Sequence, residues 1–327
     1  MTDYIRIQHN GIEYAIPNRW ELIRPEYEFT ALVKDLFLMS MGKLSPAMVR
    51  IRYVARFFDW DLQKIKDEEA LANLAMLGEQ ITFIFRISYP DNDAALSELD
   101  DYTYRLCKMI PPERLHGITI ARALQRLDYK FTVNLCFCRQ FIGAIRLEDS
   151  DILFGYTIDT SFGMLSTSLT ALQFIEAKQL IGKDESFLPL LAAILYYPGT
   201  YNSEAAHQLA TRIKAEVDID TLRAISLNFQ AFVNYLFTRT EYRLLTAARE
   251  VKSSPISTGA LESLYNLSRD GLGDIRTVEQ MGVLQYLTIL RKKIIESVRQ
   301  LHAAKMELVD IELETGLPLH IIKQILS

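Results

Sequence analysis

The sequence has few of the residues that build crosslinked or secreted scaffolds. Only 3 of its 327 residues are cysteines, and Cys136 and Cys138 are separated by a single residue. An odd number of closely spaced thiols argues against a disulfide framework. The first residues also lack the basic and apolar regions of a signal peptide. We therefore expect a cytoplasmic protein.

Long apolar runs and an excess of basic charge are missing as well. The longest apolar stretch, residues 187 to 197, is far shorter than the ~20 residues that cross a bilayer, so we expect no membrane partner. The chain has 36 Lys and Arg against 41 Asp and Glu, a net charge of -5. This balance lacks the basic surface that contacts phosphates, which argues against a nucleic-acid partner.

Hydrophobic residues are plentiful, at 49% of the chain, and they follow helical spacing. Between residues 26 and 41 they recur at intervals of three and one, and from residue 167 the same pattern continues almost to the end. Such spacing is typical of amphipathic helices. The sequence predicts a mainly α fold with two short β-hairpins, in which a multi-helix body carries a C-terminal helical extension.

The two hairpins rest on different signals. Asn10 and Gly11 separate two short β-prone runs, at residues 4 to 8 and 12 to 16, which is a strong hairpin signal. Alternating apolar residues at 131 to 137 predict a second strand, with residues 152 to 156 as its partner.

Polar breakers divide the chain into three predicted domains. Residues 1 to 88 hold the first hairpin and helices, the third of them at 67 to 87. Residues 89 to 250 form a second helical body with the short ribbon and a helix at 118 to 129. A linker at 251 to 259 then precedes a C-terminal long helix and a short terminal helix in residues 260 to 327.

Motifs for catalysis, cofactors and metals are missing. The sequence has no phosphate-binding loop, dinucleotide fingerprint, nucleophile elbow or zinc-protease helix, and its 5 histidines are scattered. Carboxylate pairs occur where Asp caps helices and turns. We therefore predict no enzyme, no catalytic or cofactor-binding residues and no metal. The pairs are Asp91 and Asp93, Asp100 and Asp101, Asp149 and Asp151, and Asp218 and Asp220.

Arginines also cluster on a predicted helix. Ser45 and Pro46 begin this helix, and Arg50, Arg52 and Arg56 fall opposite its apolar side. Charged residues on the polar face of an amphipathic helix usually contact water. We expect these three arginines to be solvated.

The C-terminal region carries a heptad stripe. A capping box at Thr277 and Gln280 predicts the start of its helix, and Arg291 and Lys305 interrupt the stripe before Gly316 ends it. We predict that the stripe binds a partner protein, while packing against residues 167 to 240 is the alternative. The predicted partner-binding residues are Leu284, Leu287, Ile294, Val298 and Leu301.

Residues 306 to 326 have the layout of a helix-turn-helix, with Gly316 in the turn. A DNA-reading helix presents long polar side chains, and this one offers Lys323 and Gln324. Two lysines against four acids between residues 305 and 327 leave a charge of -2, which repels phosphate. A helical hairpin that docks on a protein and a DNA-binding regulator both remain open.

Two stretches resemble a known family. The first joins the Asn-Gly hairpin to Ile16-Pro17-Asn18-Arg19-Trp20 and to Gly42-Lys43-Leu44-Ser45-Pro46. The second joins Leu153-Phe154-Gly155 to Leu169-Thr170-Ala171-Leu172 and to residues 190 to 198. In this order, over residues 4 to 240, they resemble tail-module proteins of phages and prophages of Bacteroidetes, including tail-assembly chaperones.

The resemblance implies a non-enzymatic assembly chaperone or adaptor in the cytoplasm of a host cell. Its partner would be the tape-measure protein or another tail component, held through apolar helices. A structural subunit of a tail or contractile-type particle is the alternative, and a DNA-binding regulator is the second alternative. No catalytic residues come with the resemblance.

Overall fold

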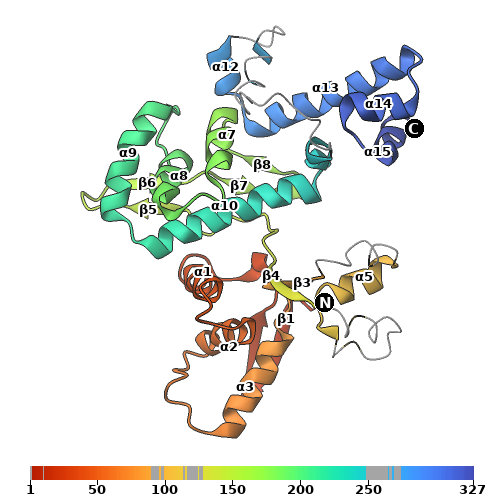
Figure 1. Ribbon diagram of the computed structural model, residues 1–327. Coiled ribbons are helices and arrows are strands. Elements are labelled where there is room, and N and C mark those ends of the chain that lie inside the picture. The colour runs from red at the N-terminus through yellow and green to blue at the C-terminus, as the bar shows by residue number, and fades with distance from the viewer. Residues whose placement is uncertain are drawn as a thin grey trace. The chain divides into compact units, whose positions relative to one another are not determined.

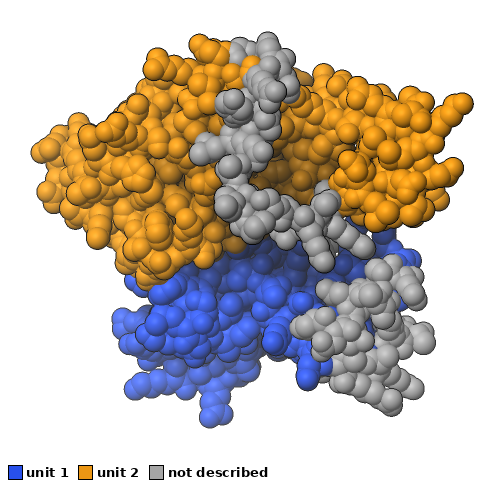
Figure 2. Space-filling model, turned by 45° about the horizontal axis from the view of Figure 1, so that its top comes forward, with its two compact units in different colours: residues 1–135 blue, residues 136–327 orange. Residues whose placement is uncertain are grey.

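The computed structural model describes residues 2–9, 11–89, 96, 99–112, 115, 124, 128–247, 264, 267–268 and 274–327. Over these residues the fold is mainly α with short antiparallel two-stranded sheets, as Figure 1 shows, which confirms the predicted fold class. The chain divides into two compact units, residues 1–135 and 136–327 (Figure 2). The boundary predicted after residue 88 therefore lies inside unit 1.

Unit 1 begins with the predicted hairpin. Strand β1 (Tyr4–His9) pairs antiparallel with β2 (Ile12–Pro17). Gly11 in the turn has φ of 76°, a conformation that a side chain disfavours. The Asn-Gly signal thus predicted the position of this hairpin.

Helices α1 (Tyr27–Ser40), α2 (Pro46–Phe57), α3 (Glu68–Gln80) and α5 (Asp101–Cys107) follow, after the 3-10 turn η1 (Trp20–Leu22). The Ser45 hydroxyl accepts a hydrogen bond from the Met48 amide at 3.2 Å, as its N-cap position predicts. The Trp20 indole packs edge-on against Phe83 and donates to the Asn134 carbonyl at 2.8 Å. Residues far apart in the sequence therefore share the core of unit 1.

The two strands of the predicted second hairpin do not pair with each other. The third helix ends at Gln80, and strand β3 (Phe85–Ser88) pairs with β4 (Lys130–Val133). Strand β6 (Ile152–Phe154) pairs instead with β5 (Ala144–Arg146) in unit 2. Four of the five residues from 83 to 87 are apolar, and such a short run fits a helix or a buried strand equally well, so its spacing could not reveal β3.

The arginines of α2 are less exposed than predicted, since Arg50 is buried and Arg52 and Arg56 are half-buried. Arg50 is 8% exposed, and its guanidinium lies 5.2 Å and 5.1 Å from the ring centres of Phe85 and Phe131. Its cation–π contacts join α2 to the β3–β4 sheet. The other two arginines of the cluster join α2 to α1 through a single carboxylate.

That carboxylate belongs to Asp35 of α1, which is 1% exposed. The Arg52 Nε atom lies 3.0 Å from its Oδ1 atom, and Arg56 donates a short hydrogen bond to Oδ2. A buried carboxylate requires such partners because it has lost its water. The α2 arginines are therefore part of the structure of unit 1.

Unit 2 is built on helices α7 (Ala171–Leu180), α8 (Leu188–Leu195), α9 (Ser203–Glu216) and α10 (Ile219–Arg239). It also contains the hairpin of β7 (Ile158–Asp159) and β8 (Ser166–Thr167). The buried Asn228 of α10 donates to the Arg139 carbonyl at 2.7 Å and accepts from the Phe141 amide at 2.8 Å. This side chain fixes an extended segment on α10.

The C-terminal part of unit 2 contains α12 (Ile275–Glu279), α13 (Val283–Ala303), α14 (Leu308–Thr315) and α15 (Leu319–Leu326), and the 3-10 segment η5 (Glu241–Thr246) precedes it in the chain. Thr277 lies inside α12, which Asp274 caps, so the predicted capping box does not begin the long helix. The linker predicted at 251 to 259 lies outside the described residues, as does most of the helix at 118 to 129.

The long helix ends earlier than the heptad stripe predicts. Lys305 has φ of 64°, and its amide donates to the His302 carbonyl at 2.9 Å. The Met306 amide donates to the Leu301 carbonyl at 3.2 Å. This pair of bonds is a Schellman motif, which usually has glycine at the position of Lys305. Because lysine occupies it, the break could not be predicted from the residue type at this position.

Candidate functional site: a groove beside the C-terminal hairpin

The predicted helix-turn-helix layout is present. Gly316 has φ of 69° between α14 and α15, and its amide donates to the Glu312 carbonyl at 2.8 Å. The two helices pack with α13 around a small apolar core. Its fully buried members are Val298, Ile311, Leu317 and Ile322.

The predicted partner-binding stripe mostly faces this core and the body of unit 2. Leu287 and Val298 are buried, and Leu284, Ile294 and Leu301 are half-buried. Ile294 and Leu301 pack against the same core as Val298. In this arrangement the stripe contributes to packing within unit 2, and the face of α13 beside it is the more accessible one.

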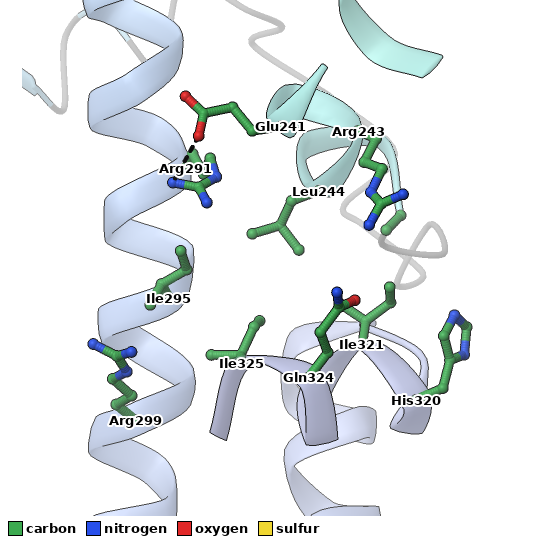
Figure 3. A pocket seen from close by; sticks show the side chains of 11 residues that line it. Glu241, Arg243, Leu244, Arg291, Ile295, Arg299, His320, Ile321, Gln324 and Ile325 are labelled. Carbon is green, nitrogen blue, oxygen red and sulfur yellow. Dashed lines mark ion pairs between the residues drawn. The ribbon is translucent and has the colours of Figure 1, made fainter. Parts of the chain in front are cut away.

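That neighbouring face borders a groove of about 590 Å³ between α13, α15 and η5, which we call the C-terminal groove (Figure 3). Leu244, Ile295 and Ile325 point toward one another and form its floor (Figure 3). Basic side chains stand around this floor. The groove is lined by Glu241, Arg243, Leu244, Ala247, Arg291, Ile295, Arg299, His320, Ile321, Gln324 and Ile325.

The rim of the groove is positively charged. It has three arginines, Arg243, Arg291 and Arg299, against one acid, Glu241, which gives a formal charge of +2 when histidine is not counted. Arg291 lies 3.4 Å from a Glu241 carboxylate oxygen. Among the described residues, neither of the other two arginines has an acidic partner.

The acidic residues of the hairpin lie on α14, away from the groove lining. Asp310 and Glu314 are exposed, and none of the α14 residues lines the groove. The net charge of residues 305 to 327 is negative because of the acids of α14. The arginines of the groove belong to α13 and η5. The fold therefore separates the two signs of charge.

Sequence reasoning missed this site, although one signal was present. Arg291 interrupts the heptad stripe, and a charged residue at an apolar position can mark a polar contact. The structure explains it as a rim residue of the groove. Arg243 carried no signal, because η5 reaches α13 only through the tertiary fold.

The carboxylate pairs that the structure describes have structural partners. Asp100 and Asp218 cap helices, as predicted, whereas Asp149 and Asp151 both pair with Arg212. Asp220 pairs with Arg223, while Asp91 and Asp93 lie outside the described part of the chain.

The part of the chain that the structure describes shows neither a metal-binding group of side chains nor a membrane-spanning helix. No three His, Cys, Asp or Glu side chains gather there in a group that could hold a metal ion. Within the same residues, no helix is both long enough and apolar enough to cross a bilayer.

Comparisons with protein-family models, with curated proteins and with solved structures found no match to this chain. The geometry of the C-terminal groove therefore carries the functional argument.

Proposed function

We propose that the protein is a non-enzymatic assembly adaptor that docks an acidic amphipathic helix in its C-terminal groove. The observation that carries the proposal is the combination of an apolar floor and three rim arginines against one glutamate. A helix with apolar residues one turn apart can place them on such a floor. Carboxylates beside them would then meet the arginines, which supplies orientation and specificity.

The volume of the groove agrees with this type of ligand. About 590 Å³ lies in the range of sites that enclose a small molecule or a few side chains, so it holds anchor residues of one helix. We propose that the adaptor acts in a phage or prophage tail module, as the resemblance of residues 4 to 240 implies. Reading frames beside its gene would test that assignment, with a tape-measure gene as the expected neighbour.

A binding experiment tests the groove directly. The probe is a fluorescein-labelled synthetic helix with leucines one turn apart and glutamates beside them, followed by anisotropy. The double variant Arg243→Glu/Arg299→Glu should weaken binding at least about tenfold, since it replaces attraction by repulsion. Lys214→Glu/Lys292→Glu is the matched control, because it changes the net charge equally at exposed residues outside the groove.

Two outcomes would contradict the proposal. If both double variants lower the affinity for the synthetic helix equally, the groove is not the binding site. If a fluorescein-labelled DNA duplex binds more tightly than the helix, with Arg243 and Arg299 required, the DNA-binding alternative is favoured instead. Retention of the protein in purified tail particles would favour a structural subunit over an adaptor that leaves.

A further inference from the structure

Helix α14 carries the kind of surface that the C-terminal groove is suited to bind. Val309 and Leu313 lie one helical turn apart and are 57% and 71% exposed. Asp310 and Glu314 follow each of them on the same exposed side of the helix. An apolar pair one turn apart beside carboxylates matches the helix that the C-terminal groove is proposed to bind.

We propose that the acidic helix bound by the groove is α14 of a second copy of this chain. This inference rests on the proposed function, because it names the ligand of the same groove. Val309 and Leu313 of one copy would lie on the floor formed by Ile295, Ile325 and Leu244 of the next. The carboxylates of Asp310 and Glu314 would face the rim arginines.

The charges of the two surfaces are complementary. Helix α14 has three acids, Asp310, Glu312 and Glu314, and no basic residue, whereas the groove rim has a formal charge of +2. Arg243 and Arg299 have no acidic partner among the described residues, so they are available to these carboxylates. Opposite charges at the two surfaces favour this register and disfavour groove-to-groove or α14-to-α14 contacts.

The two surfaces belong to one three-helix cluster but to different sides of it. Helix α14 packs on α13 and α15 through Ile311, and it contributes no residue to the groove lining. A chain therefore does not fill its own groove with α14. Because the donor helix and the acceptor groove lie on different sides of the cluster, one neighbouring copy would not contact both, and the contact would repeat from copy to copy to form rings or filaments.

Both surfaces are already folded, which lowers the cost of association. Gly316 and the apolar core fix α14 in place, so docking orders few further residues. A single exposed turn covers less area than the roughly 1,200–2,000 Å² of a stable interface, so we expect association in the micromolar range. Closure of a ring would strengthen it because each copy then makes two contacts.

Sedimentation velocity of the full chain over a range of concentrations tests the proposal. The wild type should form species larger than a dimer as the concentration rises. Leu313→Ser removes the donor surface, and Arg243→Glu/Arg299→Glu removes the acceptor. Each variant alone should remain monomeric, with a far-ultraviolet circular dichroism spectrum like that of the wild type, because all three side chains lie at the surface or the rim.

Mixing the two variants provides the decisive measurement. The Leu313→Ser chain retains its groove, and the arginine variant retains its α14, so one contact can form between them. The mixture should give a dimer with one copy of each variant that grows no further. A mixture that stays monomeric, or a wild type that stops at a dimer, would overturn the head-to-tail contact.

The outcomes separate this inference from the proposed function. A wild-type chain that binds the synthetic helix but stays monomeric at high concentration refutes the second-copy ligand alone. A chain that binds neither the helix nor a second copy refutes both. As a further check, the synthetic helix should dissolve the wild-type assemblies by competition for the groove, and failure to do so would place the self-contact elsewhere.

Discussion

Arginines cluster in two regions of this protein and have different surroundings in each. In unit 1, Arg52 and Arg56 pair with the buried Asp35, and Arg50 contacts two aromatic rings. In the C-terminal groove, Arg243 and Arg299 border an apolar floor with no acidic partner among the described residues. The two clusters have the same chemistry but different neighbours.

The difference lies in where the compensating charge is found. A cation that meets a buried carboxylate of its own chain is satisfied, and removing either partner destabilises the fold. A cation at the rim of a groove still has water as its partner, and it can exchange that water for a carboxylate of another molecule. Substitutions in unit 1 should therefore change stability, and those at the groove should change binding.

The largest effect is expected for Asp35→Ala. It leaves two arginines facing an apolar gap, and the free energy of unfolding of unit 1 should fall by about 3 to 5 kcal/mol. Both tryptophans, Trp20 and Trp60, belong to unit 1, so urea unfolding followed by their fluorescence reports on this unit. Glu13→Ala removes an exposed ion pair with Arg6 and should lower the free energy of unfolding of unit 1 by less than about 1 kcal/mol. Equal effects of the two substitutions would contradict a structural role for Asp35.

The next effect concerns the support of the groove. Ile311→Ala opens a cavity in the core shared by α13, α14 and α15, and should cost about 3 kcal/mol of local stability. Hydrogen exchange should become faster in residues 294 to 326, and helix binding should be lost with it. The tryptophan unfolding transition should not move. A shift of that transition would show that the groove and unit 1 unfold together.

Arg50→Ala should have an intermediate effect on unit 1. It removes two cation–π contacts and the packing of the arginine stem, and the loss should be about 2 kcal/mol. The tryptophan transition again measures it. Arg299→Ala is the matched control at the groove, and its stability should change by less than about 0.5 kcal/mol. If the control destabilises as much as Arg50→Ala, the contrast between the two clusters fails.

The smallest effect sharpens the contrast at the groove itself. Glu241→Gln releases Arg291 from its only ion pair among the described residues, at 3.4 Å. Because the Glu241 side chain is 54% exposed and the pair is long, stability should change by less than about 0.5 kcal/mol. The affinity for the acidic synthetic helix should rise by about two- to fivefold, since a third arginine becomes available. Anisotropy would detect the change, and a weaker affinity would mean that Glu241 itself contacts the ligand.

Features that depend on local backbone chemistry could be predicted from the sequence. The hairpin turn at Gly11, the serine cap of α2 and the glycine turn at Gly316 each require a particular residue type at a particular place. Helical spacing predicted the mainly α fold because one face of each helix must be buried. The helix caps at Asp100 and Asp218 followed from the same rules.

Features that depend on distant partners could not be predicted. Strand β4 finds β3 across more than forty residues, and nothing within β4 specifies that partner. Lys305 adopts a left-handed conformation that a lysine disfavours, because the apolar core holds Leu301 and Met306 together. The heptad stripe therefore predicts one helix across residues where the chain breaks it at Lys305.

By itself, the sequence determined where helices and turns begin, because those choices rest on each residue and its near neighbours. Only the tertiary structure decided which arginines are neutralised, since charge compensation depends on which side chains meet in space. Asp35 reaches the arginines of α2 only when α1 packs on that helix, and η5 brings Arg243 to α13 only in the folded unit 2. The same type of residue thus holds one unit together and borders a groove in the other.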